Sequence, residues 1–448
     1  MKTTKIFCWF TALTFLMALN NQASAQQTLI NADALLNVET GKLMKNVSVL
    51  VEESRIIKVS QQGDINAKNA KVVDLTGMTL VPGLMDMHAE FCEPGLEYKE
   101  DLISGANAAA KGGFTSVAIM PNTTPTRSSK TDIEFVKSKT QNHIVDVLSI
   151  GALSHNLEGK ELSEMFDMKQ AGAIAFSDNK KAIKSSGLMS RALLYAKNFD
   201  GLVISFANDE SLSHEGQMHE GEVSTSLGLE SIPTLSEELQ ISRDLFLTSY
   251  NESKIHFSTI STANSVTMIR EAKNEGINVT CEIAAHQIAL TDKALIGFDS
   301  NYKTLPPLRE DIDSEALIEG VIDGTIDIIV SDHTPQDIEC KQKEFGLAEF
   351  GIIGLQTAFP IACTHLEKHI GLEGIIQKMA INPRTVLQLD VPVIDKEFSA
   401  NITLFNPTKK WTLTKEMIVS KSANTPFIGT EFTCKVLGII NNGAIDFH

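Results

Sequence analysis

Two polar segments that lie far apart in the chain constrain its fold most strongly, because each directly follows an apolar run. The run at residues 80–85 is followed by His88 and Glu90, and the run at 326–330 is followed by Asp332. A (β/α)8 barrel gathers residues that follow distant strands at one end of its sheet. The two segments are therefore expected to meet as the first and last strand ends of such a barrel.

Between these segments, short apolar runs alternate with helical stretches, which is typical of a parallel α/β fold. Eight runs are expected to be strands, the number that a (β/α)8 TIM barrel needs, and they lie at residues 80–85, 116–120, 145–150, 171–176, 202–206, 255–260, 277–283 and 326–330. Helices are expected at 102–111 and 265–273. A doubly wound open sheet is the alternative, but it favours fewer strands and a glycine-rich nucleotide loop that the sequence lacks.

Both ends of the chain have strand-like patterns that lie outside the barrel region. Residues 28–30, 47–51, 56–59 and 71–75 precede it, and residues 402–405 and 436–440 follow it. These runs predict a small β-sandwich domain formed jointly by the N- and C-terminal segments. The expected organisation is a leader at 1–25, the first part of the β-domain at 26–79, the barrel at 80–390 and the second part of the β-domain at 391–448.

The first 26 residues have the form of an export signal. Lys2 and Lys5 precede an apolar stretch at 6–19, and residues 23–25 read Ala-Ser-Ala, which resembles a signal-peptidase site. A buried first helix is the alternative reading of the stretch, which is too short to cross a bilayer. We expect an exported, periplasmic protein with no membrane span after cleavage.

Charge and cysteine content limit the partners and the compartment chemistry. The formal net charge of −17 at pH 7 argues against nucleic acid or an anionic membrane as partner, because both require a basic surface. Of six cysteines, Cys8 lies in the leader and the other five contain no CxxC pair, so neither a structural zinc site nor a disulfide framework is expected. The sequence leaves a monomer and a homo-oligomer both open.

Three residues that can bind a metal follow predicted barrel strands. His88 follows the first strand, Asp178 the fourth and Asp332 the eighth. Imidazole nitrogens and carboxylate oxygens are both accepted ligands of zinc. Taken singly, a histidine is more often structural, and an aspartate after a strand can cap the next helix. Their shared position at strand ends favours a site.

The chain resembles the dihydroorotases of the amidohydrolase superfamily in motifs that run in order from about residue 28 to the C-terminus. These motifs are PGLMDMH at 82–88, EPG at 93–95, MPNT at 120–123, FSD at 176–178, EGEVS at 220–224, PPLR at 306–309, DHTP at 332–335, GIIGLQT at 351–357 and SKSANTP at 420–426. The resemblance implies a metal-dependent hydrolase that cleaves the C–N bond of a small cyclic amide.

The same resemblance implies roles for particular residues. The first metal would be held by His88, Glu90, Asp178 and Asp332, with Asp332 also acting as general base and then general acid. Asn122 would contact the substrate.

The chain departs from the dihydroorotase pattern where the family binds metal and recognises substrate. The replaced groups are a metal-binding histidine at Glu90, a substrate-gripping arginine at Cys92, two second-metal histidines at Phe206 and Thr259, an asparagine at Leu305 and a histidine at Gln336. These losses predict one zinc ion or none, with manganese as an alternative, because oxygen-rich ligation weakens zinc binding. Losing the arginine predicts weak binding of dihydroorotate, since a charge-assisted contact contributes about 1.5–3 kcal/mol.

Three functions are compatible with these features. The first is a cyclic-amide hydrolase with impaired or altered activity. The second is an inactive homologue, of the kind that scaffolds aspartate transcarbamoylase, although that partner is cytosolic and the export signal argues against it. The third is an exported protein that binds a small ligand at the barrel mouth without turnover.

We predict a mature N-terminus near Gln26, because the apolar stretch and the small residues at 23–25 together form a cleavable leader. Intact-mass measurement of the protein purified from its native host should show the shortened chain. A variant with arginines inside the stretch at 6–19 is expected to keep Met1. An unprocessed, cytosolic wild-type chain would contradict the prediction.

Overall fold

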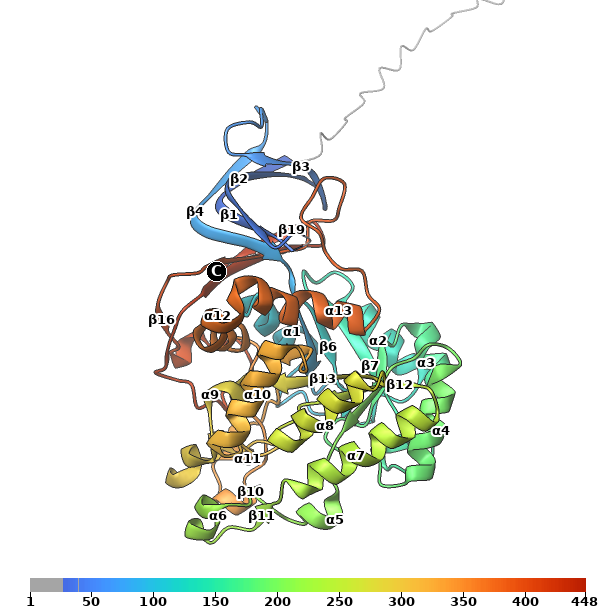
Figure 1. Cartoon of the computed structure of the whole chain (residues 1–448). Helices are drawn as coiled ribbons and strands as arrows, with labels where there is room; N and C mark the ends of the chain where they lie inside the picture. The colour runs from blue at the N-terminus through green and yellow to red at the C-terminus, as the bar shows by residue number, and fades with distance from the viewer. Residues whose placement is uncertain (1–26, 39) are drawn as a thin grey trace, which may run out of the picture.

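The computed structural model describes residues 27–38 and 40–448, which form a barrel with a β-domain at one end (Figure 1). The expected leader at 1–25 lies outside the described residues. Within the described ranges, no helix is long and apolar enough to cross a membrane.

Eight parallel strands form the barrel sheet, and each one pairs with the next in chain order. They are β5 (Leu84–Ala89), β6 (Phe114–Ile119), β7 (Asp146–Ala152), β8 (Ala175–Ser177), β9 (Val203–Phe206), β12 (Lys254–Ser258), β13 (Asn278–Ala284) and β14 (Ile328–Val330). Their near-continuous apolar sequence suits strands that are covered on both faces. The predicted (β/α)8 barrel is confirmed.

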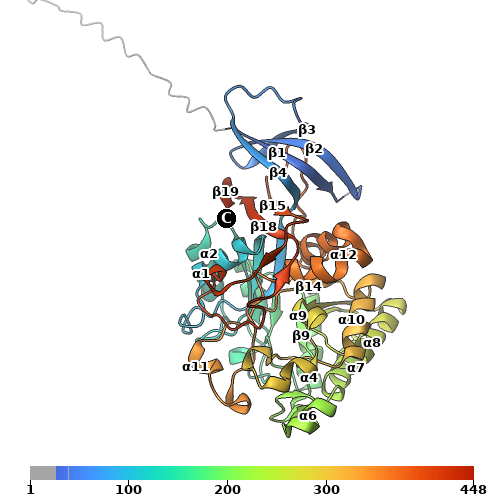
Figure 2. The ribbon, with the colours of Figure 1, turned by 90° about the vertical axis from the view of Figure 1, so that its left-hand side faces the viewer.

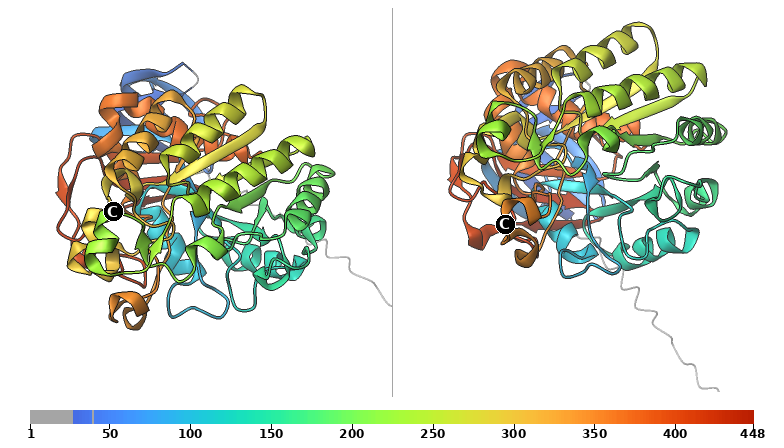
Figure 3. Two further views of the ribbon diagram at one scale, coloured as in Figure 1. Left: turned by 60° about the horizontal axis from the view of Figure 1, so that its bottom comes forward. Right: turned by 90° about the horizontal axis from the view of Figure 1, so that it is seen from below.

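A helix follows each barrel strand and covers the outside of the sheet, as the view from below shows (Figure 3). These helices are α1 (Leu102–Lys111), α2 (Lys130–Thr140), α3 (Met165–Ala171), α4 (Ser186–Lys197), α7 (Leu235–Tyr250), α8 (Ala263–Asn274), α10 (Asp311–Asp323) and α12 (Ala358–Ile376). Side chains fix several starts: Asp101 accepts hydrogen bonds from two backbone N–H groups of α1, and Thr262 accepts one from α8.

The sheet closes between its first and last strands through a side chain. The carboxylate of Asp86 accepts hydrogen bonds from the backbone N–H and the hydroxyl of Ser331, both at 2.7 Å. Just beyond, the N–H of Glu90 donates to the carbonyl of His333 at 2.8 Å. Burial raises the pKa of Asp86 to about 7, although both hydrogen bonds oppose that rise. This contact, the β5–β14 seam, brings the two polar segments side by side.

The β-domain is a seven-stranded sheet built from both ends of the chain, and Figure 2 shows it above the barrel. Its order is β19 (Ala444–Phe447), β18 (Lys435–Asn441), β15 (Ile402–Asn406), β4 (Lys71–Pro82), β1 (Gln27–Asn37), β2 (Lys42–Glu52) and β3 (Arg55–Gln61). Strand β4 pairs with β1 on one side and with β15 on the other. The joint β-domain that the terminal patterns predicted is therefore present.

The run at 80–85 differs from its prediction, because it belongs to two strands rather than one. Strand β4 ends at Pro82 in the β-domain, and β5 starts at Leu84 in the barrel. Gly83 lies between them, where an added Cβ would overlap the side chains of Asn401 and Thr115. Hydrophobicity continues across this glycine, so the pattern alone does not reveal the change of sheet.

Short elements lie in the loops of the barrel and in the C-terminal segment, and they were not predicted from the sequence. They are α5 (Glu210–Ser213), β10 (Met218–His219), α6 (Glu222–Leu227), β11 (Ser231–Ile232), α9 (His286–Ala289), α11 (Ile338–Lys341), α13 (Asn382–Val386), β16 (Trp411–Thr412) and β17 (Glu431–Phe432). In Figure 1, β10, β11 and α6 lie at the end of the barrel away from the β-domain.

Candidate active site at the barrel mouth

A cavity of about 250 Å³ opens at the carboxyl ends of the barrel strands. Its lining includes four of the five residues that were expected to bind metal or substrate, Glu90, Asn122, Asp178 and Asp332. His88, the fifth, is fully buried near the end of β5 and contacts cavity-lining residues. This end of the sheet is where (β/α)8 barrels carry their sites.

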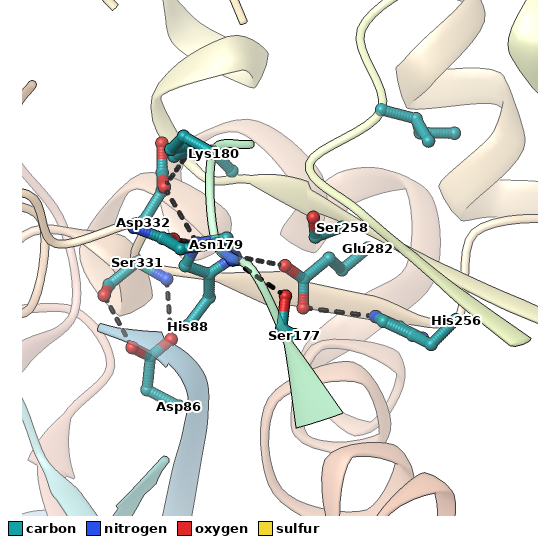
Figure 4. A network of polar contacts seen from close by, with 12 residues as sticks. Asp86, His88, Ser177, Asn179, Lys180, His256, Ser258, Glu282, Ser331 and Asp332 are labelled. Carbon is teal, nitrogen blue, oxygen red and sulfur yellow. Dashed lines mark hydrogen bonds and ion pairs between the residues drawn. The ribbon is translucent and has the colours of Figure 1, made fainter. Parts of the chain in front are cut away.

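Glu282, on β13, accepts hydrogen bonds from two buried histidines (Figure 4). Its carboxylate lies 2.6 Å from Nδ1 of His88 and 3.3 Å from Nε2 of His256. Burial alone would raise the pKa of Glu282, but the two histidines outweigh it and lower the pKa to about 2. Burial by itself would lower the pKa of His88. The Glu282 carboxylate outweighs burial, so the pKa of His88 is raised.

The other nitrogen of His88 faces polar groups from the segments that follow β8 and β14. Nε2 lies 3.3 Å from Oδ1 of Asn179 and 3.6 Å from Oδ1 of Asp332. The amide of Asn179 also donates to Glu90 at 2.7 Å, so this side chain links the histidine to the glutamate. Asn179 adopts a φ of +55°, which turns its side chain into the site directly after β8.

Asp178 does not join this group, although it precedes Asn179. Its carboxylate accepts hydrogen bonds from the backbone N–H groups of Leu153 and Ser154 at 3.0 and 2.9 Å, and also from the Ser154 hydroxyl. These three donors hold the loop after β7, while burial raises the pKa of the carboxyl group. The structure therefore places Asn179, rather than the expected Asp178, beside His88 and Glu90.

Lys180 reaches into the same site and pairs with Asp332. Its Nζ donates to Oδ1 of Asp332 at 2.6 Å (Figure 4). The same nitrogen lies 5.5 Å from the centroid of the Phe206 ring. Only 16% of the Lys180 side chain and 5% of the Asp332 side chain are exposed. The ammonium is thus held by a carboxylate and an aromatic face.

The positions that the resemblance assigns to a second metal carry groups that ligate poorly. Phe206 has no ligand atom, and the buried hydroxyl of Thr259 has no hydrogen-bond partner among the described residues. His256 lies nearby, but its ring is engaged by Thr280 at 2.8 Å and by Glu282. These side chains do not fit a binuclear centre.

The residues of the first-metal position do not fit a metal ion either. In the described part of the chain, no three histidine, cysteine, aspartate or glutamate side chains are grouped so that they could hold one. The Asp178 carboxylate is engaged by the backbone N–H and the hydroxyl of Ser154, and Asp332 is paired with the Lys180 ammonium. A divalent ion placed beside an ammonium would be repelled by it.

The substrate-recognition positions are also changed. Cys92 lies in the cavity wall at 4% exposure, and burial raises the pKa of its thiol, which keeps it neutral. Leu305 is apolar, and the side chain of Gln336 donates to the carbonyl of Phe350 at 2.9 Å. The position expected to grip a substrate carboxylate therefore carries no charge.

Three site residues were missed by sequence reasoning. Asn179 and Lys180 directly follow the FSD motif, in which Asp178 was expected to be the ligand. Consecutive side chains at a strand end point in different directions, so the next residue can reach the site when the aspartate does not. Glu282 carried a clearer signal, because a charged residue within an apolar strand must find a partner when it is buried.

A larger cavity, of about 400 Å³, lies at the amino ends of β9, β12 and β13. Its charged groups include Asp200 and Lys254, which pair with each other at 2.6 Å. This cavity is at the amino end of the barrel, whereas His88 and Asp332 lie at its carboxyl end. Barrels of this kind carry their active sites at the carboxyl ends of the strands. Size alone does not make it the functional site.

The fold and the site define a hydrolase-type (β/α)8 barrel with an attached β-domain, and comparisons with known proteins identify its family. A model of the Dihydro-orotase-like family matches residues 77–265. The dihydroorotase of Syntrophus aciditrophicus is 41% identical over 404 residues, which cover 90% of this chain and 95% of that protein. The dihydroorotase of Pelotomaculum thermopropionicum is 42% identical over 401 residues, covering 88% and 94%.

The chain belongs to the dihydroorotase family of the amidohydrolase superfamily. Solved structures agree on the fold. The L-hydantoinase (dihydropyrimidinase) of Arthrobacter aurescens has a TM-score of 0.82 at 19% identity, covering 94% of this chain and 96% of that one. The dihydropyrimidinase of Brevibacillus agri NCHU1002 has a TM-score of 0.79 at 21% identity, covering 94% and 95%. The resemblance seen in the sequence motifs is confirmed.

We predict that Glu282→Gln lowers the free energy of unfolding by about 3–5 kcal/mol, because it breaks a buried charged network. The pKa of His88 should fall, since the carboxylate is what raises it. Urea denaturation and NMR titration measure the two effects. The exposed Glu275→Gln is the matched control and should change neither.

The pH dependence adds a check on the same variant. Because its folded-state pKa is depressed, Glu282 contributes stability that is present above the ordinary value of 4.5 and is lost as the pH falls towards about 2. The difference in the free energy of unfolding between wild type and Glu282→Gln should therefore shrink as the pH falls over that interval. A constant difference would contradict the assignment.

Proposed function

We propose that this chain is a cyclic amidohydrolase of altered specificity, which binds a small cyclic amide in the cavity at the barrel mouth. The observation that supports this most directly is the convergence of Asp332, Lys180 and Asn122 on one cavity at the carboxyl ends of the strands. Membership of the dihydroorotase family and the hydantoinase-like fold support the same substrate class.

The chemistry would use the chain's own groups. Water adds to the ring carbonyl carbon while the Asp332 carboxylate accepts its proton, and that proton then passes to the ring nitrogen as the C–N bond breaks. The Lys180 ammonium would donate to the carbonyl oxygen as negative charge develops there. Asn122 would orient the ring. One zinc ion or none was expected from the sequence, with manganese as an alternative, and any such ion would have to compete with Lys180 for Asp332.

Binding without turnover is the second candidate, and one contact favours it. The ion pair between Lys180 and Asp332 engages the carboxylate that would otherwise take a proton from water. In that case the cavity would hold a small ligand, and the fold would be retained for recognition alone. Export to the periplasm, supported by the leader, suits either candidate, and a homo-oligomer is compatible with both. A role as a scaffold for a cytosolic enzyme would be incompatible with cleavage of the leader and export.

Dihydroorotate is expected to bind weakly, because the neutral Cys92 thiol replaces a charge-assisted contact worth about 1.5–3 kcal/mol, or about 10- to 150-fold in affinity. Calorimetry with dihydroorotate measures this, with the Syntrophus aciditrophicus dihydroorotase titrated in parallel as the reference. Comparable, saturable affinities in the two proteins would argue against the altered specificity.

Turnover separates the two candidates. Purified protein incubated with dihydroorotate, hydantoins, dihydropyrimidines and simple lactams should open at least one ring if the chain is a hydrolase. Asp332→Asn should then reduce the rate by at least about 100-fold, as expected for loss of an acid–base group. The exposed Asp390→Asn is the control and should retain the wild-type rate. Saturable binding without ring opening across the panel would favour the binding protein.

A further inference from the structure

One oxygen of Asp332 has two neighbours that would ordinarily compete for it. Oδ1 lies 2.6 Å from Nζ of Lys180 and 3.6 Å from Nε2 of His88. The carboxylate and the imidazole are the donors that the sequence assigned to a metal ion. In the structure, the ammonium stands beside both.

Several groups hold the ammonium in this position. The Phe206 ring faces it from the end of β9, with the centroid 5.5 Å from Nζ. Charge also favours the arrangement, because Asp332 is 5% exposed and a carboxylate buried to that extent needs a compensating cation. The side chain of Lys180 is itself largely buried, so the pair is shielded from salt and water.

We propose that Lys180 takes the place of the metal cation, so that the barrel mouth is a metal-independent site with a cation built into the chain. The positive charge that a metal-dependent member of the family obtains from an ion is here supplied by a side chain on the loop after β8. The negative charge of Asp332 is balanced by a side chain of the protein and not by an ion that exchanges with solvent. This inference concerns the composition of the site and does not depend on which of the two candidate functions is correct.

A single substitution should reverse the arrangement. Removing the ammonium leaves the Asp332 carboxylate unpaired, 3.6 Å from Nε2 of His88, and that nitrogen lies 3.3 Å from Oδ1 of Asn179. Nitrogen and oxygen donors of this kind suit Mn²⁺ or Zn²⁺. Lys180→Ala should therefore gain a metal ion that the wild type does not bind.

The test is metal binding by the full-length purified protein, with no substrate present. Wild type, Lys180→Ala and Lys181→Ala are dialysed against Mn²⁺ or Zn²⁺ and then against metal-free buffer. Elemental analysis and the EPR signal of bound Mn²⁺ give the stoichiometry. Lys181→Ala removes the same charge one residue further along and is the matched control.

We expect no stoichiometric metal in wild type or Lys181→Ala, and about one equivalent in Lys180→Ala, because only that change frees the carboxylate. Adding Asp332→Asn to Lys180→Ala should abolish the gain. The proposal is overturned if wild type holds one or more tightly bound ions, if Lys180→Ala gains none, or if both lysine variants gain equally.

A second variant guards against loss of folding. Lys180→Met keeps an apolar stem over Phe206 but carries no charge, so it should fold and bind metal as Lys180→Ala does. Circular dichroism establishes the fold before metal is added. Because the wild-type measurement needs no variant, stoichiometric metal in that sample refutes the proposal whatever the variants do. Absence of turnover, by contrast, would bear only on the proposed hydrolase activity.

Discussion

The β5–β14 seam is the contact on which the site depends. The Asp86 carboxylate accepts hydrogen bonds from both the backbone N–H and the hydroxyl of Ser331, so the middle of β5 is joined to the residue that directly follows β14. His88 lies two residues beyond Asp86, and Asp332 follows Ser331 directly. Their 3.6 Å approach is therefore a consequence of barrel closure, and it is made between strands that no local interaction would bring together.

The barrel could be predicted because its evidence is repetitive. Eight apolar runs in alternation with helices leave few arrangements that bury all of them, and the order of the strands then follows the chain. Boundaries between sheets are a different matter. Gly83 separates β4 from β5 through the crowding of Asn401 and Thr115, which come from distant parts of the sequence. A local pattern contains no record of such a contact.

The site was predictable in position but only partly in composition. Strand ends identified His88, Glu90 and Asp332 as neighbours, because a barrel collects them whatever their chemistry. Choosing between Asp178 and Asn179 required the backbone angle after β8 and the two N–H groups that capture the Asp178 carboxylate. Residue type favoured the aspartate, and geometry favoured the amide.

The β-domain carries a consequence for the order in which the chain can fold. Strand β4 needs β1 on one side and β15 on the other, and β15 is synthesised only after the whole barrel. The first strands to leave the ribosome must therefore wait, with one edge unpaired, until nearly the last residues appear. An unpaired edge is a template for association with other chains. Until β15 has been made, the free edge of β4 is therefore a place where the growing chain can associate with other chains.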